Sequence, residues 1–177
     1  MTLILWFRRD LRLADNPALA AAVAAGEPVL PVYIRDDAEA GTWAPGGASR
    51  WWLHGSLESL AADLETRGSR LTLRTGRAAE VLSGLVAETG ARAVIWNRRH
   101  EPWARAQEED VRERLSALGV ACRSAEGGLL HDPAKLRTGS GGPYRVFTPF
   151  WTALRSGVRL PPQASTPEAL PPSPQVA

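Results

Sequence analysis

Residues 6–16 read WFRRDLRLADN, and in this stretch an apolar run (3–7) changes abruptly to charge. The apolar run is typical of a buried strand, and Asn16 followed by Pro17 is typical of a helix N-cap and a first helical residue. Open α/β sheets bind their ligands where strands end and helices begin. The stretch therefore predicts a first strand that ends in a candidate site. The alternative is a solvated loop joined by salt bridges.

Strand and helix signals continue to alternate until about residue 124. Helical patterns separate short apolar runs, and the predicted strands lie at 3–7, 29–34, 71–74, 93–96 and 120–124. This alternation predicts an α/β fold: a doubly wound five-stranded parallel sheet (Rossmann-like, order 3-2-1-4-5) with helices on both faces. Pro31 argues against a central position for the second strand, because proline cannot donate a ladder hydrogen bond.

A long helix is predicted after the Gly/Pro-rich loop at 41–47, with Ser49 as its candidate N-cap. Leucines recur on one helical face, which indicates the side that packs on the sheet. These leucines are Leu53, Leu57, Leu60 and Leu64. Trp51 and Trp52 lie at the start of the same helix, and we expect at least one of them to face its buried side.

The C-terminal part departs from the alternation. Residues 144–151, YRVFTPFW, predict a last short helix with Thr148 as its cap and Pro149 as its first residue. Residues 161–177 read PPQASTPEALPPSPQVA, which is the composition of an extended, semi-rigid linker. We therefore expect one domain over 1–157 and an interdomain linker over 158–177 that buries nothing, with a second domain missing from this chain.

Composition indicates an ordinary globular protein. Of the 177 residues, 44% are hydrophobic and 23% are charged, and no apolar run is long enough to span a membrane. Cys122 is the single cysteine, which excludes an intrachain disulfide and favours a cytoplasmic location. The net charge of +2, without a long basic run, does not indicate an arm that binds nucleic acid.

In the order 3-2-1-4-5, the switch point of the sheet lies between the first and fourth strands. We expect the segments 7–10 and 97–101 to converge there, with the loop at 35–50 as a roof. Trp43, Trp51 and Trp52 are candidates to offer flat surfaces to a ring system. A mixture of aromatic groups and a few fixed polar groups is typical of a small-cofactor site.

Common catalytic signatures are missing from the sequence. No GxGxxG follows the first strand and no phosphate-binding P-loop occurs, so nothing favours NAD or ATP in their usual modes. The three histidines are too scattered to predict a metal site. Asp10 and Glu101 are a candidate carboxylate pair, but the neighbouring arginines would keep both ionised and structural. We expect no self-sufficient catalytic site.

Five segments carry a family resemblance: WFRRDLRLADN (6–16), PVYIRD (31–36), RWWL (50–53), WNRRHEP (96–102) and YRVFTPFW (144–151). In this order and spacing they resemble the N-terminal α/β domain of the DNA photolyase/cryptochrome family. Within the family they are most similar to the bacterial cyclobutane pyrimidine dimer photolyases. The resemblance covers about residues 1–157.

The resemblance implies a division of labour. The α/β domain of such proteins holds an antenna chromophore, a deazaflavin or a reduced folate. A helical C-terminal domain holds FAD, grips DNA, flips out the lesion and splits it by electron transfer. The chain would thus bind the pigment and dock on the FAD-binding helical domain of the same or a separate chain. It would reach DNA only through that domain, and it would be inactive in repair by itself.

The resemblance also implies roles for individual residues. Folate-binding members of one subtype carry an Asn-Glu pair where this chain has Trp103 and Ala104, whereas 101–105, EPWAR, is similar to the deazaflavin-type subgroup; the pigment stays undecided between the two. The implied cofactor-binding residues are Arg35, Asp36, Arg50, Asn97, Arg99, Glu101 and Trp103. The residues implied in architecture and interdomain docking are Arg8, Arg9, Asp10, Arg12, Tyr144, Phe147, Phe150 and Trp151.

Three alternatives stay open. A cryptochrome photoreceptor would share this domain and differ mostly in the other half. A stand-alone binding or regulatory module would have kept the fold and lost the photochemistry. Exposed Phe147, Phe150 and Trp151 would argue against such a module, because large bare apolar patches mark a missing partner. A generic nucleotide-binding module with the same sheet order is the third.

Overall fold

The computed structural model describes residues 1–37, 41–129, 131–132, 135–158 and 162–176. The chain forms two compact units. Unit 1 consists of residues 1–127 and 164–177, and unit 2 consists of residues 128–163. Unit 1 contains the sheet and the candidate site.

Unit 1 is built on a parallel sheet of five strands in the order β3-β2-β1-β4-β5. The predicted topology is therefore confirmed. The strands are β1 (Leu3–Phe7), β2 (Val29–Arg35), β3 (Thr72–Thr75), β4 (Ala93–Asn97) and β5 (Ala121–Ala125). Because all strands run the same way, β1, β2 and β4 end at one edge of the sheet, where doubly wound folds bind their ligands.

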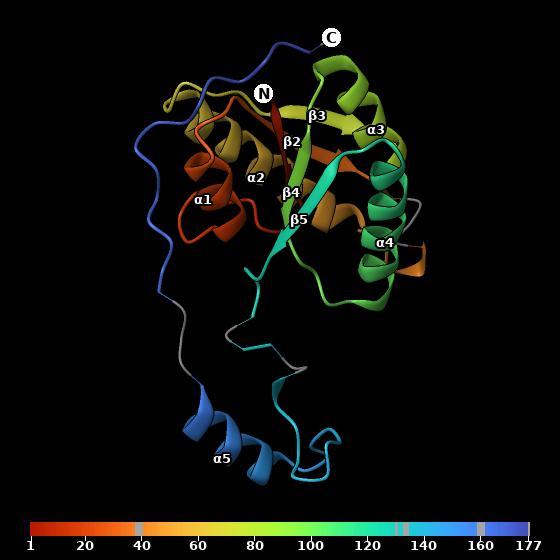
Figure 1. The fold of residues 1–177 in the computed structure, drawn as a ribbon, viewed down its shortest axis with the longest axis vertical. Helices are drawn as coiled ribbons and strands as arrows, with labels where there is room; N and C mark the ends of the chain where they lie inside the picture. The colour runs from red at the N-terminus through yellow and green to blue at the C-terminus, as the bar shows by residue number, and fades with distance from the viewer. Residues whose placement is uncertain (38–40, 130, 133–134, 159–161, 177) are drawn as a thin grey trace. The chain divides into compact units, whose positions relative to one another are not determined.

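Helices cover both faces of this sheet (Figure 1). Two lie on one face, α1 (Pro17–Ala24) and α2 (Gly47–Glu65), and two lie on the other, α3 (Ala78–Thr89) and α4 (Pro102–Ala117). A short 3-10 helix, η1 (Gly41–Trp43), precedes α2. As predicted, Asn16 caps α1: its side chain accepts a hydrogen bond from the Leu19 N–H.

The core is divided by the alternation of side chains along the strands. The face that packs on α3 and α4 includes Ile4, Trp6, Leu30, Val32, Val94 and Trp96. The face that packs on α1 and α2 includes Leu3, Leu5, Phe7, Val29, Ala93 and Ile95. Every residue of β1 and β4 is buried because helices cover both faces, which explains why these strands are apolar almost throughout.

Pro31 lies in a central strand, between β1 and β3, as the predicted strand order requires. The ladder to β3 begins only at Val32, so the proline lies just before the doubly paired part of β2. Helix α2 begins at Gly47 after Gly46, and not after Ser49.

The expectation that Trp51 or Trp52 faces the buried side of α2 is also wrong. Trp51 is 75% exposed and Trp52 is 73% exposed. The buried residues of α2 are Leu60 and Leu64, which lie in its C-terminal half. Only that half packs on the sheet, so the first turns of the helix present their tryptophans to solvent.

The proline-rich tail packs on unit 1, and the expectation that it buries nothing is wrong. Leu170 is only 9% exposed and belongs to the core cluster beside α1 and α2. Its N–H donates to the Arg67 carbonyl over 3.0 Å, and the Pro172 carbonyl accepts from the Val29 N–H over 3.2 Å. The tail is extended, as its composition predicts, but it supplies a leucine and backbone hydrogen bonds to the domain.

The described residues of unit 2 include the helix α5 (Phe147–Gly157), which follows Val146 rather than the predicted cap Thr148. No residue of α5 is buried. Phe147 and Trp151 stack with ring centroids 6.2 Å apart, and Phe150 packs beside Tyr144 and Phe147 at 6.4 Å from each. The aromatic residues thus contact one another on a helix that lacks a buried face.

Among the described residues, no helix combines the length and the apolar character needed to cross a membrane.

Replacing Leu170 with Ala should lower the free energy of unfolding by about 2–3 kcal/mol, because it removes a core contact that fixes the tail. Leu118→Ala is the matched control: Leu118 is 55% exposed, so its loss should change stability by about 0.5 kcal/mol or less. Urea unfolding of the two variants measures both values. Equal stabilities for the two variants would show that the tail does not contribute to the core.

Candidate functional site

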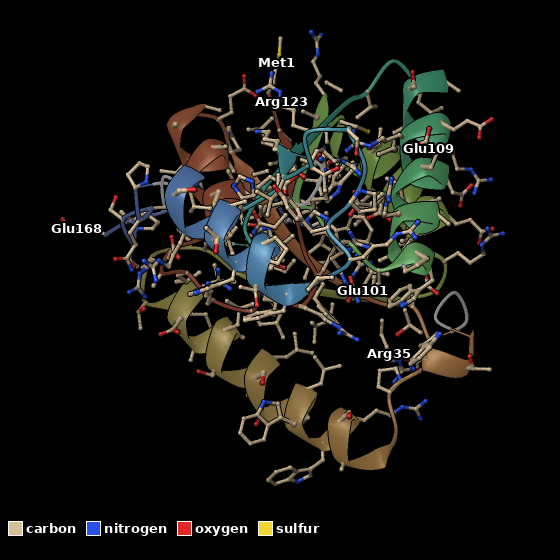
Figure 2. The ribbon with its side chains drawn as sticks, turned by 90° about the horizontal axis from the view of Figure 1, so that it is seen from below. Met1, Arg35, Glu101, Glu109, Arg123 and Glu168 are labelled. Atoms are coloured by element: carbon tan, nitrogen blue, oxygen red, sulfur yellow. The ribbon has the colours of Figure 1, made fainter. Side chains whose placement is uncertain are left out.

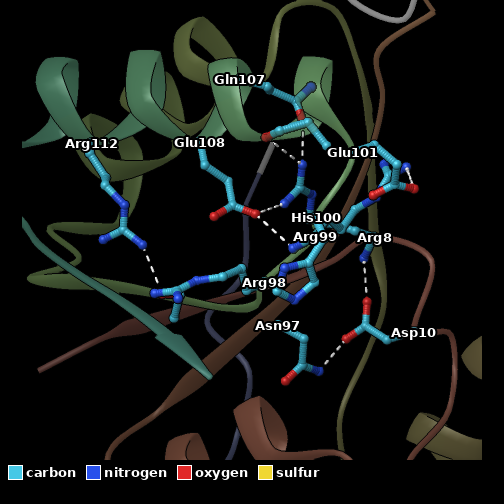
Figure 3. Close-up of polar contacts among 12 residues, drawn as sticks. Arg8, Asp10, Asn97, Arg98, Arg99, His100, Glu101, Gln107, Glu108 and Arg112 are labelled. Carbon is cyan, nitrogen blue, oxygen red and sulfur yellow. Dashed lines mark hydrogen bonds and ion pairs between the residues drawn. The ribbon is translucent and has the colours of Figure 1, made fainter. Parts of the chain in front are cut away.

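The site begins with a buried ion pair that joins the end of β1 to α4. The Arg8 guanidinium binds the Glu108 carboxylate, and its Nη2 donates to Gln107 Oε1 over 2.7 Å (Figure 3). Arg8 also lies 4.5 Å above the Trp6 ring. Burial lowers the pKa of Arg8 to about 10, although Glu108 acts in the opposite direction. The guanidinium therefore stays charged at neutral pH.

Glu108 also fixes the loop after β4. Its Oε1 accepts a hydrogen bond from the Arg99 N–H over 3.0 Å, so one carboxylate holds the ends of two neighbouring strands. Gln107, which precedes Glu108 on α4, donates to Asp36 Oδ2 over 3.2 Å. Asp36 also accepts a hydrogen bond from the Ala78 N–H at the start of α3. The first turns of α4 thereby position the segments that follow β1, β2 and β4.

A second polar network fills the switch point on the side of α1. Asn97 donates to both Asp10 and Asn16, and its Oδ1 accepts from the Ala18 N–H over 3.1 Å. A Cβ at Gly127 would lie 2.7 Å from Asn97 Cγ, so only glycine allows this close approach of the chain. The segments after β1 and β4 converge as predicted, but here their side chains bind one another and leave little room for a ligand.

Open space lies on the other side of this network, next to α4 and η1. A cavity of about 90 Å³ reaches the ends of β1 and β2. Its lining includes Trp6, Arg9, Tyr33, Asp36, Trp43, Arg99, Trp103 and Gln107. A wider groove of about 700 Å³ runs from it along α2 and shares several lining residues with it, Trp43 among them. The cavity alone is smaller than a usual cofactor site, but the groove has the volume of one.

The rim of the cavity beside α4 carries two arginines and one carboxylate. Glu101 lies 2.8 Å from Arg99 Nη2 and 3.3 Å from Arg9 Nη1. Partial burial by itself raises the pKa of Glu101, but the Arg99 hydrogen bond, a backbone hydrogen bond and the two positive charges outweigh it. The pKa is therefore lowered to about 2, and the carboxylate is ionised at neutral pH.

The rim beside β2 repeats this arrangement. Asp37, which lines the cavity, lies 3.3 Å from Arg50 Nη2 and 3.9 Å from Arg35 Nε. Figure 2 labels Arg35, the last residue of β2, and Glu101, which follows β4; they belong to the two halves of the rim. Each half therefore holds one carboxylate between two guanidinium groups.

The residues implied in cofactor binding divide into three groups. Asp36, Arg99 and Trp103 line the cavity, and Arg35, Arg50 and Glu101 belong to the ion pairs of its rim. Asn97 lies in the polar network at the switch point. Asp10 and Glu101 engage separate partners, so they form no acid–base pair.

Sequence reasoning missed several lining residues. Tyr33 lies within β2, and only the residues at the end of that strand and after it were predicted to bind a ligand. Gln107 lies four residues after Trp103. Residues four apart share a helix face, so this spacing was a usable signal for Gln107. Trp6 gave no such signal, because its strand is buried on both faces.

The residues implied in architecture and docking lie in both units. In unit 1, Arg8 and Asp10 are held in the networks described above, and Arg9 lies on the rim. Arg12 donates to the carbonyls of Ala14, Asp15 and Gly127. In unit 2, the implied residues contact one another: Tyr144, which precedes α5, and Phe147, Phe150 and Trp151 of α5.

Glu108→Gln should destabilise unit 1 by about 3 kcal/mol, because it leaves the buried Arg8 charge without its counterion. Glu109→Gln, an exposed neighbour on the same helix, should change stability by about 0.5 kcal/mol or less. Chemical denaturation of the pair measures the difference. If both variants match the parent chain, the Arg8 charge does not need Glu108.

Glu101→Gln should reduce stability by about 1 kcal/mol at neutral pH, since 38% of the side chain is exposed and water screens its ion pairs. The pKa is lowered on folding, so this contribution is present above pH 4.5, the unperturbed value, and is lost as the pH falls towards about 2. Unfolding curves recorded from neutral to acidic pH test the trend, with Glu113→Gln as an exposed control. A difference that grows in acid would contradict the assignment.

Comparison with known proteins places this geometry in one family. The family model described as DNA photolyase matches residues 3–173. The deoxyribodipyrimidine photo-lyase of Agrobacterium fabrum is 49% identical over 167 residues, which are 94% of this chain and 34% of that protein. Cryptochrome-2 of Arabidopsis thaliana is 40% identical over 149 residues, 84% of this chain and 24% of that protein. The chain thus spans about a third or less of these relatives.

Solved structures of photolyases are also similar to this chain. The bacterial class III photolyase of Agrobacterium tumefaciens has a TM-score of 0.90 and 48% identity, and the match covers 99% of this chain and 36% of that one. An archaeal photolyase of Sulfolobus tokodaii, described with two FAD molecules and an implied novel light-harvesting cofactor, has a TM-score of 0.81 and 27% identity over 98% of this chain and 38% of that one. Sheet order, motifs and these matches together show that the chain belongs to the DNA photolyase family, as the counterpart of its α/β domain.

Proposed function

We propose that this chain is the light-harvesting domain of a deoxyribodipyrimidine photolyase, which binds an antenna pigment at the ends of β1, β2 and β4. The observation that carries the proposal is the cavity between η1 and α4, where Tyr33, Trp43 and Trp103 offer aromatic surfaces beside fixed polar groups. Sites of this composition suit planar ring systems. When bound, the pigment would supply the absorption of light; the residues of the chain bind and orient it.

The polar residues of the cavity fit a heterocyclic ring. Gln107 and Asp36 are held by hydrogen bonds to each other, so their oxygen and nitrogen atoms are fixed before a ligand arrives. The Arg99 guanidinium stacks on the Trp103 ring at 4.3 Å, which keeps both flat groups on one side of the cavity. Deazaflavin and reduced folate both remain candidates. Trp103 favours the deazaflavin, since it stands where one folate-binding subtype has a polar residue.

The second part of the proposal is a companion domain. Phe147 is 71% exposed and Trp151 is 45% exposed on a helix without buried residues. Bare aromatic groups of this kind mark a surface that another protein covers, and we assign that role to an FAD-binding helical domain of the same or a separate chain. The chain would then act in the cytoplasm, pass excitation energy to FAD, reach DNA through that domain and repair nothing by itself.

A cryptochrome photoreceptor is the second candidate, supported by the similarity to cryptochrome-2 of Arabidopsis thaliana. The exposed aromatic residues of α5 count against a stand-alone regulatory module, because an isolated domain would gain solubility by replacing them.

Absorption spectra of the purified chain, recorded with and without added reduced folate or deazaflavin, test the proposal. A bound pigment should show a shifted band and co-elute with the protein. If neither pigment binds at concentrations that saturate related domains, the cavity is not an antenna site.

Trp43→Ala should weaken pigment binding about tenfold or more, because Trp43 lines both the cavity and the groove. The matched control is Trp51→Ala: Trp51 is equally exposed, at 75% against 74% for Trp43, but it lines neither of them. Titration followed by fluorescence quenching measures both affinities. Equal losses in the two variants would mean that the ring does not contact Trp43.

A further inference from the structure

Two tryptophans in the cavity wall each carry a guanidinium group over their ring. The Arg99 Cζ lies 4.3 Å from the ring centroid of Trp103, and the Arg8 Cζ lies 4.5 Å from that of Trp6. Both tryptophans line the cavity. Contacts of this kind place a positive charge against the electron-rich face of an indole. A ligand in the cavity would therefore meet indoles that are already in contact with a cation.

The same arrangement continues behind the wall. Trp6 packs edge to face against Trp96, with ring centroids 5.7 Å apart. Trp96 is fully buried, and the Arg112 Cζ lies 4.7 Å from its ring centroid. Arg112 belongs to α4 (Figure 3). Each ring of this buried pair thus has a guanidinium group of its own.

The nearby carboxylates do not cancel all of this positive charge. Glu101 is the carboxylate that binds Arg99, and it also binds Arg9, so these three side chains carry one net positive charge. Arg112 donates to the Ser124 hydroxyl over 2.8 Å, and in the described part of the chain it has no carboxylate partner. Positive potential therefore remains at the rings beneath both arginines.

A positive charge changes what an indole can do to an excited pigment. An indole in contact with an excited aromatic ring can give it one electron: the indole becomes a radical cation, and the excited ring gains the electron. The electron then returns, and the absorbed energy is lost as heat. A guanidinium group beside the indole opposes this step, because its charge repels that of the radical cation.

Trp43 provides a comparison within the same wall. It lines the cavity and the groove, and among the described residues no guanidinium group lies over its ring. The wall therefore combines one bare indole with two covered ones. Only the bare indole should donate electrons efficiently.

We propose that the guanidinium groups suppress electron donation from the tryptophans that they cover, and so lengthen the excited state of a pigment bound in the cavity. The inference rests on the proposed function and adds an electronic role for Arg8, Arg99 and Arg112. They are positioning residues in this role, since each acts by holding a charge against a ring. An antenna benefits because its excitation must last until it is passed on.

The experiment measures the fluorescence lifetime of bound pigment in the intact chain, with methenyl-tetrahydrofolate and a deazaflavin as probes. Each variant is measured at a saturating concentration, so that changes in affinity do not enter the result. Arg99→Gln should shorten the lifetime about twofold or more, because it removes the charge from the Trp103 ring. Arg99→Lys should keep most of the lifetime, because an ammonium group also binds the face of an indole.

A second substitution shows whether the effect passes through the ring. In a Trp103→Phe background, adding Arg99→Gln should no longer shorten the lifetime, because the electron donor is gone. Trp43→Phe should lengthen the lifetime, because it removes the bare indole. The matched control is Arg105→Gln, an exposed arginine of α4 outside the cavity lining, which should leave the lifetime unchanged. Melting temperatures confirm that each variant is folded.

The outcomes separate this inference from the proposed function. If Arg99→Gln keeps the parent lifetime, or shortens it equally with and without the Trp103 indole, the shielding role is refuted while the pigment site remains. If neither probe binds the folded parent chain, the proposed pigment site itself fails, and the inference fails with it.

Discussion

The buried pair of Arg8 and Glu108 is the contact on which the geometry of the site depends. A guanidinium with 3% of its side chain exposed must be paired and hydrogen-bonded, or the domain loses several kcal/mol, about 3–5 for comparable pairs. Glu108 meets this requirement from α4 and at the same time holds the Arg99 backbone. One carboxylate thereby ties the segments that follow β1 and β4 to α4. These contacts hold Arg8 and Arg99, which line the cavity.

The resulting site is suited to binding rather than to catalysis. Its carboxylates are engaged by arginines, by backbone N–H groups or by amide side chains, so none is arranged to transfer a proton. The polar network around Asn97 closes one side of the switch point, and the open side is aromatic and edged with arginine. A rigid cradle of this kind can orient a planar ring, and the match to the photolyase of Agrobacterium fabrum covers 34% of that protein.

Two segments beyond the sheet show that composition alone does not decide burial. The tail at 164–176 is rich in proline, yet it places Leu170 in the core and its carbonyl groups accept from the N–H groups of Asp15 and Val29. Helix α5 is rich in aromatic residues, yet none of its residues is buried. The first segment completes its own domain, whereas the second leaves Phe147 and Trp151 exposed.

The sequence by itself determined the sheet order, because alternating apolar runs and helical patterns allow few topologies, and the motif at 6–16 indicated the functional edge of the sheet. Arg99 and Asp36 were predictable because they follow strands that must end together, whereas Trp103 was implied by the family resemblance. Tertiary structure decided the rest. The positions of the helices and of the tail over the sheet decide three things that the sequence left open. They decide whether Asn97 faces a ligand or Asp10, whether Trp51 is buried, and whether Leu170 joins the core. Local sequence patterns determine whether a segment forms a helix or a strand. The burial of a side chain depends on the segments that pack against it, and these come together only in the tertiary structure.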